Sequence, residues 1–156
     1  MKTFVQWVTD NNLICELLDQ PVPYQQYQQD SYDGNKDTAY RFIIDKETYE
    51  VELHHYDNGE VNVEFGRINK NTGRHDIGIT GTGRGKQYQL FATVKAIVQD
   101  YVSKNPNVNS IAYSAEEKSR KKLYNRMNRR LGSETGWTPT ATVHPGYNDY
   151  SLYKSK

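Results

Sequence analysis

Three consecutive runs of alternating apolar and polar residues constrain the fold of this chain most strongly. They read TAYRFIID at residues 38–45, TYEVELHHYD at 48–57 and VNVEFGRIN at 61–69. A period of two places apolar side chains on one face of a strand and polar side chains on the other. The runs therefore predict consecutive antiparallel strands, and RHDIGIT at residues 74–80 predicts a fourth.

The residues between these runs are typical of tight turns. Asp45-Lys46-Glu47 and Asn71-Thr72-Gly73 each join two predicted strands, and Asp57-Asn58-Gly59 contains Asn-Gly, the strongest hairpin signal in the chain. The strands are therefore predicted to form hairpins.

Helical periodicity follows the strands. Apolar residues repeat at i, i+3, i+4 and i+7 from Leu90 to Val102, and Asn105-Pro106 ends this helix. A short strand is predicted at 108–114. A second helix is predicted over residues 115–131, with Ser114 and Glu117 as a capping box and Gly132 as its C-terminal stop. Two last strands, at about 138–143 and 149–153, flank the hairpin residues HPGYN. The order predicts an α+β fold with a mostly antiparallel, mixed sheet flanked by helices.

The first 37 residues follow a different pattern. Residues 3–19 have apolar side chains at near-helical spacing and predict one or two short helices, interrupted at residues 10–12. Residues 20–37 contain two prolines and a Gln/Tyr-rich run. They are predicted to be a loop, either a plain linker or a flap over a site.

Composition limits the class of protein. A chain of 156 residues is most simply a single domain. The single cysteine, Cys15, excludes an internal disulfide framework and a cysteine-based zinc site, and it suits a reducing, cytoplasmic environment. The first residues do not resemble a signal peptide, and no apolar run of 18 residues exists that could span a membrane.

Charge is divided unevenly along the chain. Residues 1–60 hold 4 Lys and Arg against 12 Asp and Glu, whereas the remainder holds 16 against 7. The later part is therefore expected to meet an anion, which could be a cofactor phosphate, a nucleic acid or the acidic part of the same chain.

The stretch TGTGRGKQYQLF at residues 80–91 leads from a predicted strand into a helix. Free backbone N–H groups at a helix start bind anions, and glycines let a phosphate approach the backbone. The stretch lacks the spacing of a P-loop, and the antiparallel strands before it do not form a βαβ unit. Two interpretations remain, an anion-binding loop and a plain turn.

A resemblance rests on this loop and on the later helix. The loop Arg84-Gly85-Lys86-Gln87, followed by helix, strand and a helix reading RKKLYNRMNRRLGSETGW at 120–137, resembles the GNAT N-acetyltransferase superfamily. Members of that superfamily carry Arg-Gly-X-Gly in the loop and A..LYEKLGF at the end of the next helix. The similarity covers about residues 61–153. It implies a GNAT-like fold, acetyl-CoA as co-substrate and an amine as acceptor.

The resemblance also implies site residues. The pyrophosphate of coenzyme A would rest on the loop, and the pantetheine arm would run beside the preceding strand. Tyr124 would be the general acid that protonates the departing thiolate, although taken alone it is equally well an ordinary tyrosine at the core edge. A carboxylate, Glu64 or Asp76, would take the proton of the amine. The implied cofactor-binding residues are Ile77, Gly78, Ile79, Gly83, Arg84, Gly85, Lys86 and Gln87.

The four histidines do not predict a metal site. His54 and His55 are neighbours on a strand and must point to opposite faces, so one is expected to be buried and the other solvated. His75 and His144 show no recognisable ligand spacing.

The predicted helix over residues 115–131 supports an alternative function. Its many cations face only Glu116 and Glu117, and they could follow a phosphate backbone, bind a protein partner or form a solvated surface. The alternative is therefore a non-catalytic GNAT-like protein that contacts nucleic acid or a protein through this helix. A third class is an accessory protein whose many tyrosines make oligomer contacts. The cations are Lys118, Arg120, Lys121, Lys122, Arg126, Arg129 and Arg130.

Overall fold

An antiparallel meander forms the first part of the fold. The computed structural model describes residues 20–73, 75–76, 84–115 and 118–154, so the helices predicted over residues 3–19 lie outside the described part. The meander consists of β1 (Tyr24–Tyr32), β2 (Asn35–Ile44), β3 (Glu47–His55) and β4 (Glu60–Ile68). The three strands predicted by alternation are confirmed as β2, β3 and β4. Asp45 and Lys46 have positive φ values of 52° and 67°, which suits a tight hairpin turn.

Strand β1 corrects the prediction of a loop over residues 20–37. It pairs with β2 along its length, with a register shift between Gln26 and Gln28. Every residue of β1 after Tyr24 is exposed because the strand forms the edge of the sheet. An exposed edge strand has no buried face to enforce alternation, so its sequence of glutamines and tyrosines gave no period of two.

The second part of the chain adds helices and completes the sheet. It contains β5 (His75–Asp76), α2 (Arg84–Lys104), β6 (Ser110–Ala115), α3 (Lys118–Thr135), β7 (Thr138–His144) and β8 (Tyr147–Tyr153). The strand order is β1-β2-β3-β4-β6-β8-β7, with β5 paired to β4 off this path. Among the described strands, only β4 and β6 pair in parallel, so the prediction of a mostly antiparallel, mixed sheet in an α+β fold is confirmed. Arg74 and residues 77–80 of the fourth predicted strand lie outside the described residues.

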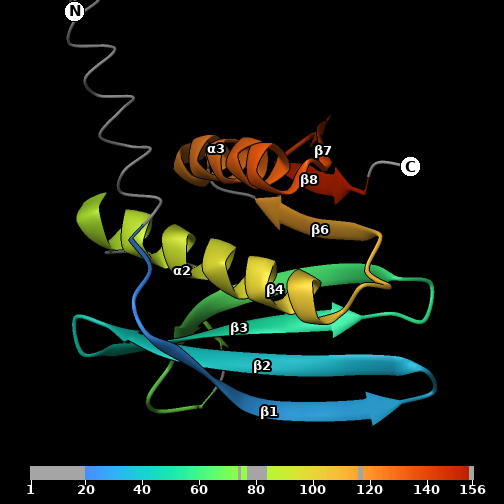
Figure 1. Cartoon of the computed structure of the whole chain (residues 1–156). Coiled ribbons are helices and arrows are strands. Elements are labelled where there is room, and N and C mark those ends of the chain that lie inside the picture. The colour runs from blue at the N-terminus through green and yellow to red at the C-terminus, as the bar shows by residue number, and fades with distance from the viewer. Residues whose placement is uncertain (1–19, 74, 77–83, 116–117, 155–156) are drawn as a thin grey trace, which may run out of the picture.

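Both described helices lie on the same side of the sheet, as Figure 1 shows. The predicted apolar stripe of α2 is buried against β2 to β4, and it includes Leu90, Phe91, Val94, Ile97, Val98 and Tyr101. Lys95 of α2 is also buried, and its Nζ lies 3.2 Å from Oε1 of Glu134 on α3. In the described part of the chain, no helix is both long and apolar enough to cross a membrane.

The ends of α3 differ from the prediction. Ser114 lies in β6, where it pairs with Asp149, so the helix begins at Lys118 and Ser114 is not its cap. Gly132 lies inside the helix, which continues to Thr135. The residue that ends α3 is Gly136, with φ +75° and its N–H 2.9 Å from the carbonyl of Gly132. Glycine is favoured there because L side chains rarely adopt this conformation.

Candidate functional site

Along the edge of β4 that faces β6, the pairing seen among the described residues is interrupted. Three register pairs join β4 to β6, ending at Asn62 and Ala112, and β5 pairs with Arg67 and Ile68. Since Arg67 pairs with Tyr49 of β3 on its other side, β5 lies on the edge that β6 has left. Among the described residues, no strand pairs with this edge between Asn62 and Arg67. We call residues 63–66, for which no partner on this edge is described, the unpaired segment.

Tyr124 of α3 stands on the helix side of the unpaired segment. Its ring centroid lies 5.5 Å from that of Phe65 on β4 and 5.1 Å from that of Tyr113 on β6. Phe91 of α2 lies 5.0 Å away, edge to face, and Tyr150 of β8 is stacked at 5.7 Å. The structure therefore brings Tyr124 to the place where β4 and β6 separate, packed within aromatic rings from four elements.

A buried network of hydrogen bonds lies beside this aromatic cluster. The Tyr113 hydroxyl donates a hydrogen bond of 2.7 Å to Oδ1 of Asn128, one turn after Tyr124 on α3. Nδ2 of Asn128 donates to the carbonyls of Thr140 and Ser151, each at 3.1 Å. Burial raises the pKa of Tyr113 well above its ordinary value, so its phenol remains a donor. Sequence reasoning missed Asn128, whose signal was an amide at i+4 from Tyr124.

Glu64 lies on the opposite face of the sheet from Tyr124. Its neighbours Val63 and Phe65 point into the core and are buried, while Glu64 is exposed, as alternation predicted. In the register, Glu64 is directly opposite Glu52 of β3. The two sequence-predicted side chains thus flank the unpaired segment from its two faces and do not meet.

More polar side chains surround Glu64 on that face. His54 Nδ1 lies 2.9 Å from Oδ1 of Asp37, and its Nε2 lies 3.5 Å from Oε2 of Glu52. We call Asp37, Glu52, His54 and Glu64 the acidic face. His55 points to the other side and is buried, which confirms the prediction of one buried histidine, whereas His54 is half-buried and not fully solvated.

The remaining predicted site residues are described only in part. The backbone of Asp76 pairs with Arg67, but nothing is described of its side chain. Arg84, Gly85 and Lys86 form the first turn of α2 without described side chains, and Gln87 follows as a half-buried residue. Residues 77–83, with Ile77, Gly78, Ile79 and Gly83, lie outside the described part.

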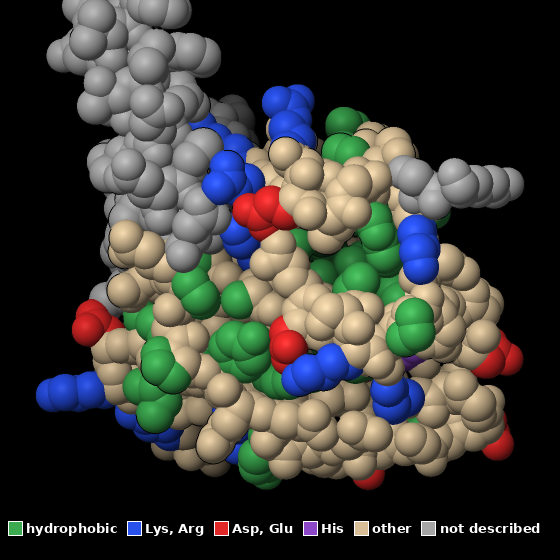
Figure 2. Space-filling view, in the orientation of Figure 1, with side chains coloured by type: hydrophobic (Ala, Val, Ile, Leu, Met, Phe, Trp, Pro, Cys, Tyr) green, Lys and Arg blue, Asp and Glu red, His purple; other side chains and the backbone are tan. Residues whose placement is uncertain are grey.

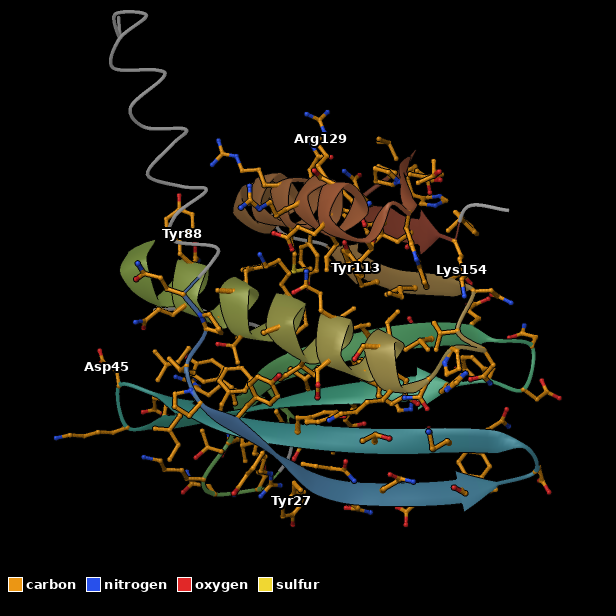
Figure 3. All side chains as sticks on the ribbon, in the orientation of Figure 1. Tyr27, Asp45, Tyr88, Tyr113, Arg129 and Lys154 are labelled. Atoms are coloured by element: carbon orange, nitrogen blue, oxygen red, sulfur yellow. The ribbon has the colours of Figure 1, made fainter. Side chains whose placement is uncertain are left out.

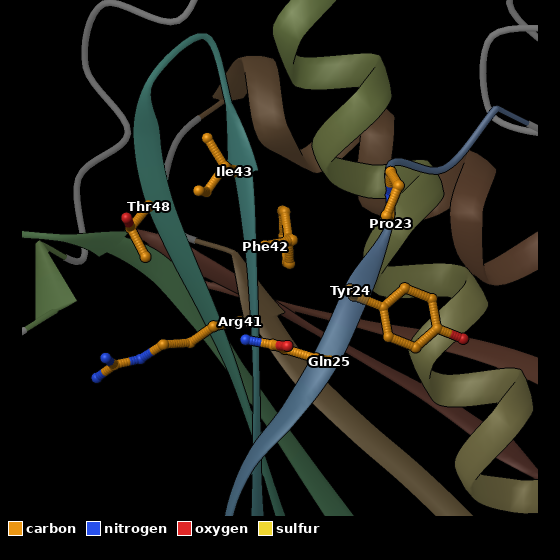
Figure 4. Close-up of a pocket in the computed structure, with 7 residues that line it drawn as sticks. All are labelled: Pro23, Tyr24, Gln25, Arg41, Phe42, Ile43 and Thr48. Carbon is orange, nitrogen blue, oxygen red and sulfur yellow. The ribbon is translucent and has the colours of Figure 1, made fainter.

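A hollow lies among β1, β2 and β3, away from the unpaired segment. Its volume is about 500 Å³, and it is lined by Pro23, Tyr24, Gln25, Arg41, Phe42, Ile43 and Thr48 (Figure 4). Its charged side chain, Arg41, already contacts the Glu50 carboxylate at 2.5 Å and the face of the Tyr27 ring at 3.6 Å. The charged side chain in the lining of this hollow is therefore already engaged and is not available to bind or activate a substrate.

Metal-binding clusters and known relatives give no further identification. Within the described residues, no group of three or more His, Cys, Asp and Glu side chains is placed to hold a metal ion. Comparisons with protein-family models, with curated proteins and with solved structures found no match to this chain.

Proposed function

We propose that this chain is an acyl-CoA-dependent N-acyltransferase of the GNAT type, which transfers an acetyl group from acetyl-CoA to an amine. The observation that carries the proposal is the unpaired segment of β4 with Tyr124 beside it. A strand edge can take up an extended ligand with amide groups, which pairs with its backbone N–H and C=O groups. The pantetheine arm of coenzyme A is such a ligand.

The proposed chemistry uses one side chain from each face of the sheet. Bound acetyl-CoA supplies a thioester whose acetyl group is transferred to the amine. Glu64 would accept the proton of the attacking amine, directly or through water, while Tyr124 would donate its phenolic proton to the sulfur as the carbon–sulfur bond breaks. Exchange with water then returns both side chains to their starting states. Asp76 remains the second candidate for the base.

The acceptor would approach from the acidic face. Asp37 and Glu52 lie beside His54, and Glu64 lies opposite Glu52, so this face favours a cationic ligand over an anionic one. Arg84, Gly85, Lys86 and Gln87 at the start of α2 would be available to the pyrophosphate. An amine that is protonated in water would thus meet negative charge before it loses its proton to Glu64.

Calorimetric titration with acetyl-CoA and coenzyme A tests binding, and release of free thiol with a panel of primary amines tests turnover. Tyr124→Phe should leave the acetyl-CoA affinity within about twofold and lower kcat by about 100-fold, as expected for a lost general acid. Tyr150→Phe is the matched control, because that ring stacks on Tyr124 in the same cluster. Its kcat should stay within about threefold of the wild type.

Two results would contradict the proposal. One is an absence of acetyl-CoA binding at millimolar ligand. The other is equal loss of turnover in Tyr124→Phe and Tyr150→Phe, which would indicate a disturbed cluster and no chemical role for the Tyr124 hydroxyl.

A second candidate function is nucleic-acid binding through α3. It is favoured by the scarcity of carboxylate partners for the arginines of this helix among the described residues. Arg130 pairs with Glu134 at 2.8 Å, but among the described residues no carboxylate pairs with Arg126 or Arg129. Arg129 points away from the body of the molecule in Figure 3, and Lys and Arg side chains gather over α3 in Figure 2. Charge reversal at Arg126, Arg129 and Arg130 should abolish a steeply salt-dependent affinity for nucleic acid. An affinity that survives the reversal would remove this candidate.

A further inference from the structure

A second hollow, of about 370 Å³, lies at the amino end of β4, away from the unpaired segment. The β1–β2 turn, the β3–β4 turn and the segment after α2 surround it, contributing Gly34, Asn35, Tyr56, Asp57, Asn105 and Asn107. Hydrogen bonds hold these segments together. The Asp57 N–H donates to Oδ1 of Asn35 at 3.1 Å, and Lys36 Nζ donates to Oδ1 of Asn105 at 2.6 Å. The hollow therefore has walls fixed from three directions.

Lys36 contributes a cation to this hollow. Its Nζ donates a hydrogen bond of 2.6 Å to Oδ1 of Asn105 and lies 5.1 Å from the centroid of the Tyr101 ring. In the described part of the chain, no carboxylate lies within ion-pairing distance of this ammonium. Two of its contacts are thus neutral groups, and an anion could still pair with it.

His55 contributes a buried imidazole next to this cation. Its exposed fraction is 5%, and its Nδ1 lies 2.9 Å from the Tyr101 hydroxyl. Its Nε2 faces Nδ2 of Asn107 at 3.5 Å, which is too long for a strong hydrogen bond. Nε2 is therefore the ring atom that a ligand in the hollow would contact.

Burial and a neighbouring cation both disfavour the charged form of His55. Burial, and then the charge of Lys36, lower the pKa of His55, so the ring is neutral at pH 7. The titratable groups facing it are Lys36 of β2, Tyr101 of α2, and Tyr56 and Asp57 of the β3–β4 turn. Asp57 would oppose an anion, but it is exposed to water, which screens its charge.

We propose that this hollow binds a phosphate-sized oxyanion, with Lys36 Nζ and His55 Nε2 as its main donors. The side-chain amides of Asn35, Asn105 and Asn107 line the same space and supply neutral donors. Entry of the anion favours the protonated form of His55, because a second positive charge is then matched by negative charge. Binding is thereby linked to uptake of a proton. The site is separate from the unpaired segment and does not depend on the proposed acyltransferase activity.

Sulfate is the probe for the test, because its charge stays constant between pH 5 and 8, whereas phosphate itself titrates there. NMR of the whole chain follows the His55 ring and the amides around the hollow during sulfate titrations at several pH values. Saturable shifts confined to this region are expected, with an affinity that increases as the pH falls. The His55 pKa at saturating sulfate should exceed its value in sulfate-free buffer.

Matched variants separate specific pairing from general charge. Lys36→Met keeps the aliphatic stem and should weaken sulfate binding by about tenfold or more. Lys70→Met removes an exposed cation far along the chain, in the β4–β5 turn, and should change the affinity by less than about twofold. His55→Gln should retain part of the affinity and lose its pH dependence.

Three outcomes would overturn the proposal. They are an absence of saturable shifts in the wild type, equal weakening in Lys36→Met and Lys70→Met, and a His55 pKa that sulfate does not change. The wild-type pH titration does not depend on any variant, so the test still decides if His55→Gln fails to fold.

Discussion

At the scale of single residues, Asn128 is the side chain on which the aromatic cluster depends most. It satisfies the Tyr113 hydroxyl and two strand carbonyls at once, and it is buried. Asn128→Ala should lower the free energy of unfolding by about 2–4 kcal/mol, because three polar groups would lose their partner without gaining water. Urea denaturation measures this loss.

Two further variants separate the parts of this network. Tyr113→Phe removes one of the three hydrogen bonds and should cost about 1–2 kcal/mol. Asn71→Ala, in the exposed β4–β5 turn, should stay within about 0.5 kcal/mol of the wild type. A loss for Asn128→Ala no larger than that for Asn71→Ala would show that water reaches the network.

At the scale of elements, the end of α3 gives a prediction that opposes helix propensity. Alanine in place of an exposed glycine within a helix usually stabilises by about 1 kcal/mol. At Gly132, however, a Cβ would lie 2.9 Å from the Trp137 carbonyl oxygen and 3.0 Å from Cδ of Pro139. Gly132→Ala should therefore destabilise the protein by about 1–3 kcal/mol. Thermal unfolding measures the change, with Ser133→Ala on the exposed side of the same turn as a control. If Gly132→Ala were more stable than the wild type, the segment after α3 would have to shift away from the new Cβ at no cost in free energy.

The helices and strands also show how much of the fold could be predicted from the sequence. Strands β2 to β4 and helix α2 were predictable because one face of each is buried, which forces a period on the sequence. Strand β1 has no buried face beyond Tyr24. The sequence near the end of α3 offers two glycine stop signals four residues apart, and the helix passes Gly132 and ends at Gly136.

The candidate site was predictable to a similar degree. Alternation was sufficient to place Glu64 opposite Val63 and Phe65. The position of Tyr124 between β4 and β6 required the parallel pairing of strands 50 residues apart, such as Glu60 with Ser110. Neither Asn128 nor the hollow at Lys36 and His55 could be predicted, because each joins segments that only the fold brings together.

At the scale of the whole molecule, buried tyrosines should limit stability in alkali. Burial is the main cause that raises the pKa of Tyr101 from 10.0 to about 12, and burial raises that of Tyr113 and Tyr40 in the same direction. In the unfolded chain these phenols ionise near their ordinary value, so the unfolded state releases protons first as the pH rises. The stability they support is complete below pH 10 and is lost progressively toward pH 12.

Urea denaturation at a series of pH values, with phenolate absorbance recorded in parallel, tests this expectation. The free energy of unfolding of the wild type should fall between pH 10 and 12, and phenolate should appear together with unfolding. Tyr101→Phe loses the hydrogen bond to His55 and should be less stable at neutral pH, yet its stability should fall less steeply in alkali. Tyr27→Phe changes an exposed tyrosine and should keep the wild-type slope, because lysines and the other tyrosines titrate alike in both proteins. Equal slopes for Tyr101→Phe and the wild type would mean that Tyr101 ionises in the folded state as readily as in the unfolded chain, and that its burial does not govern alkaline unfolding.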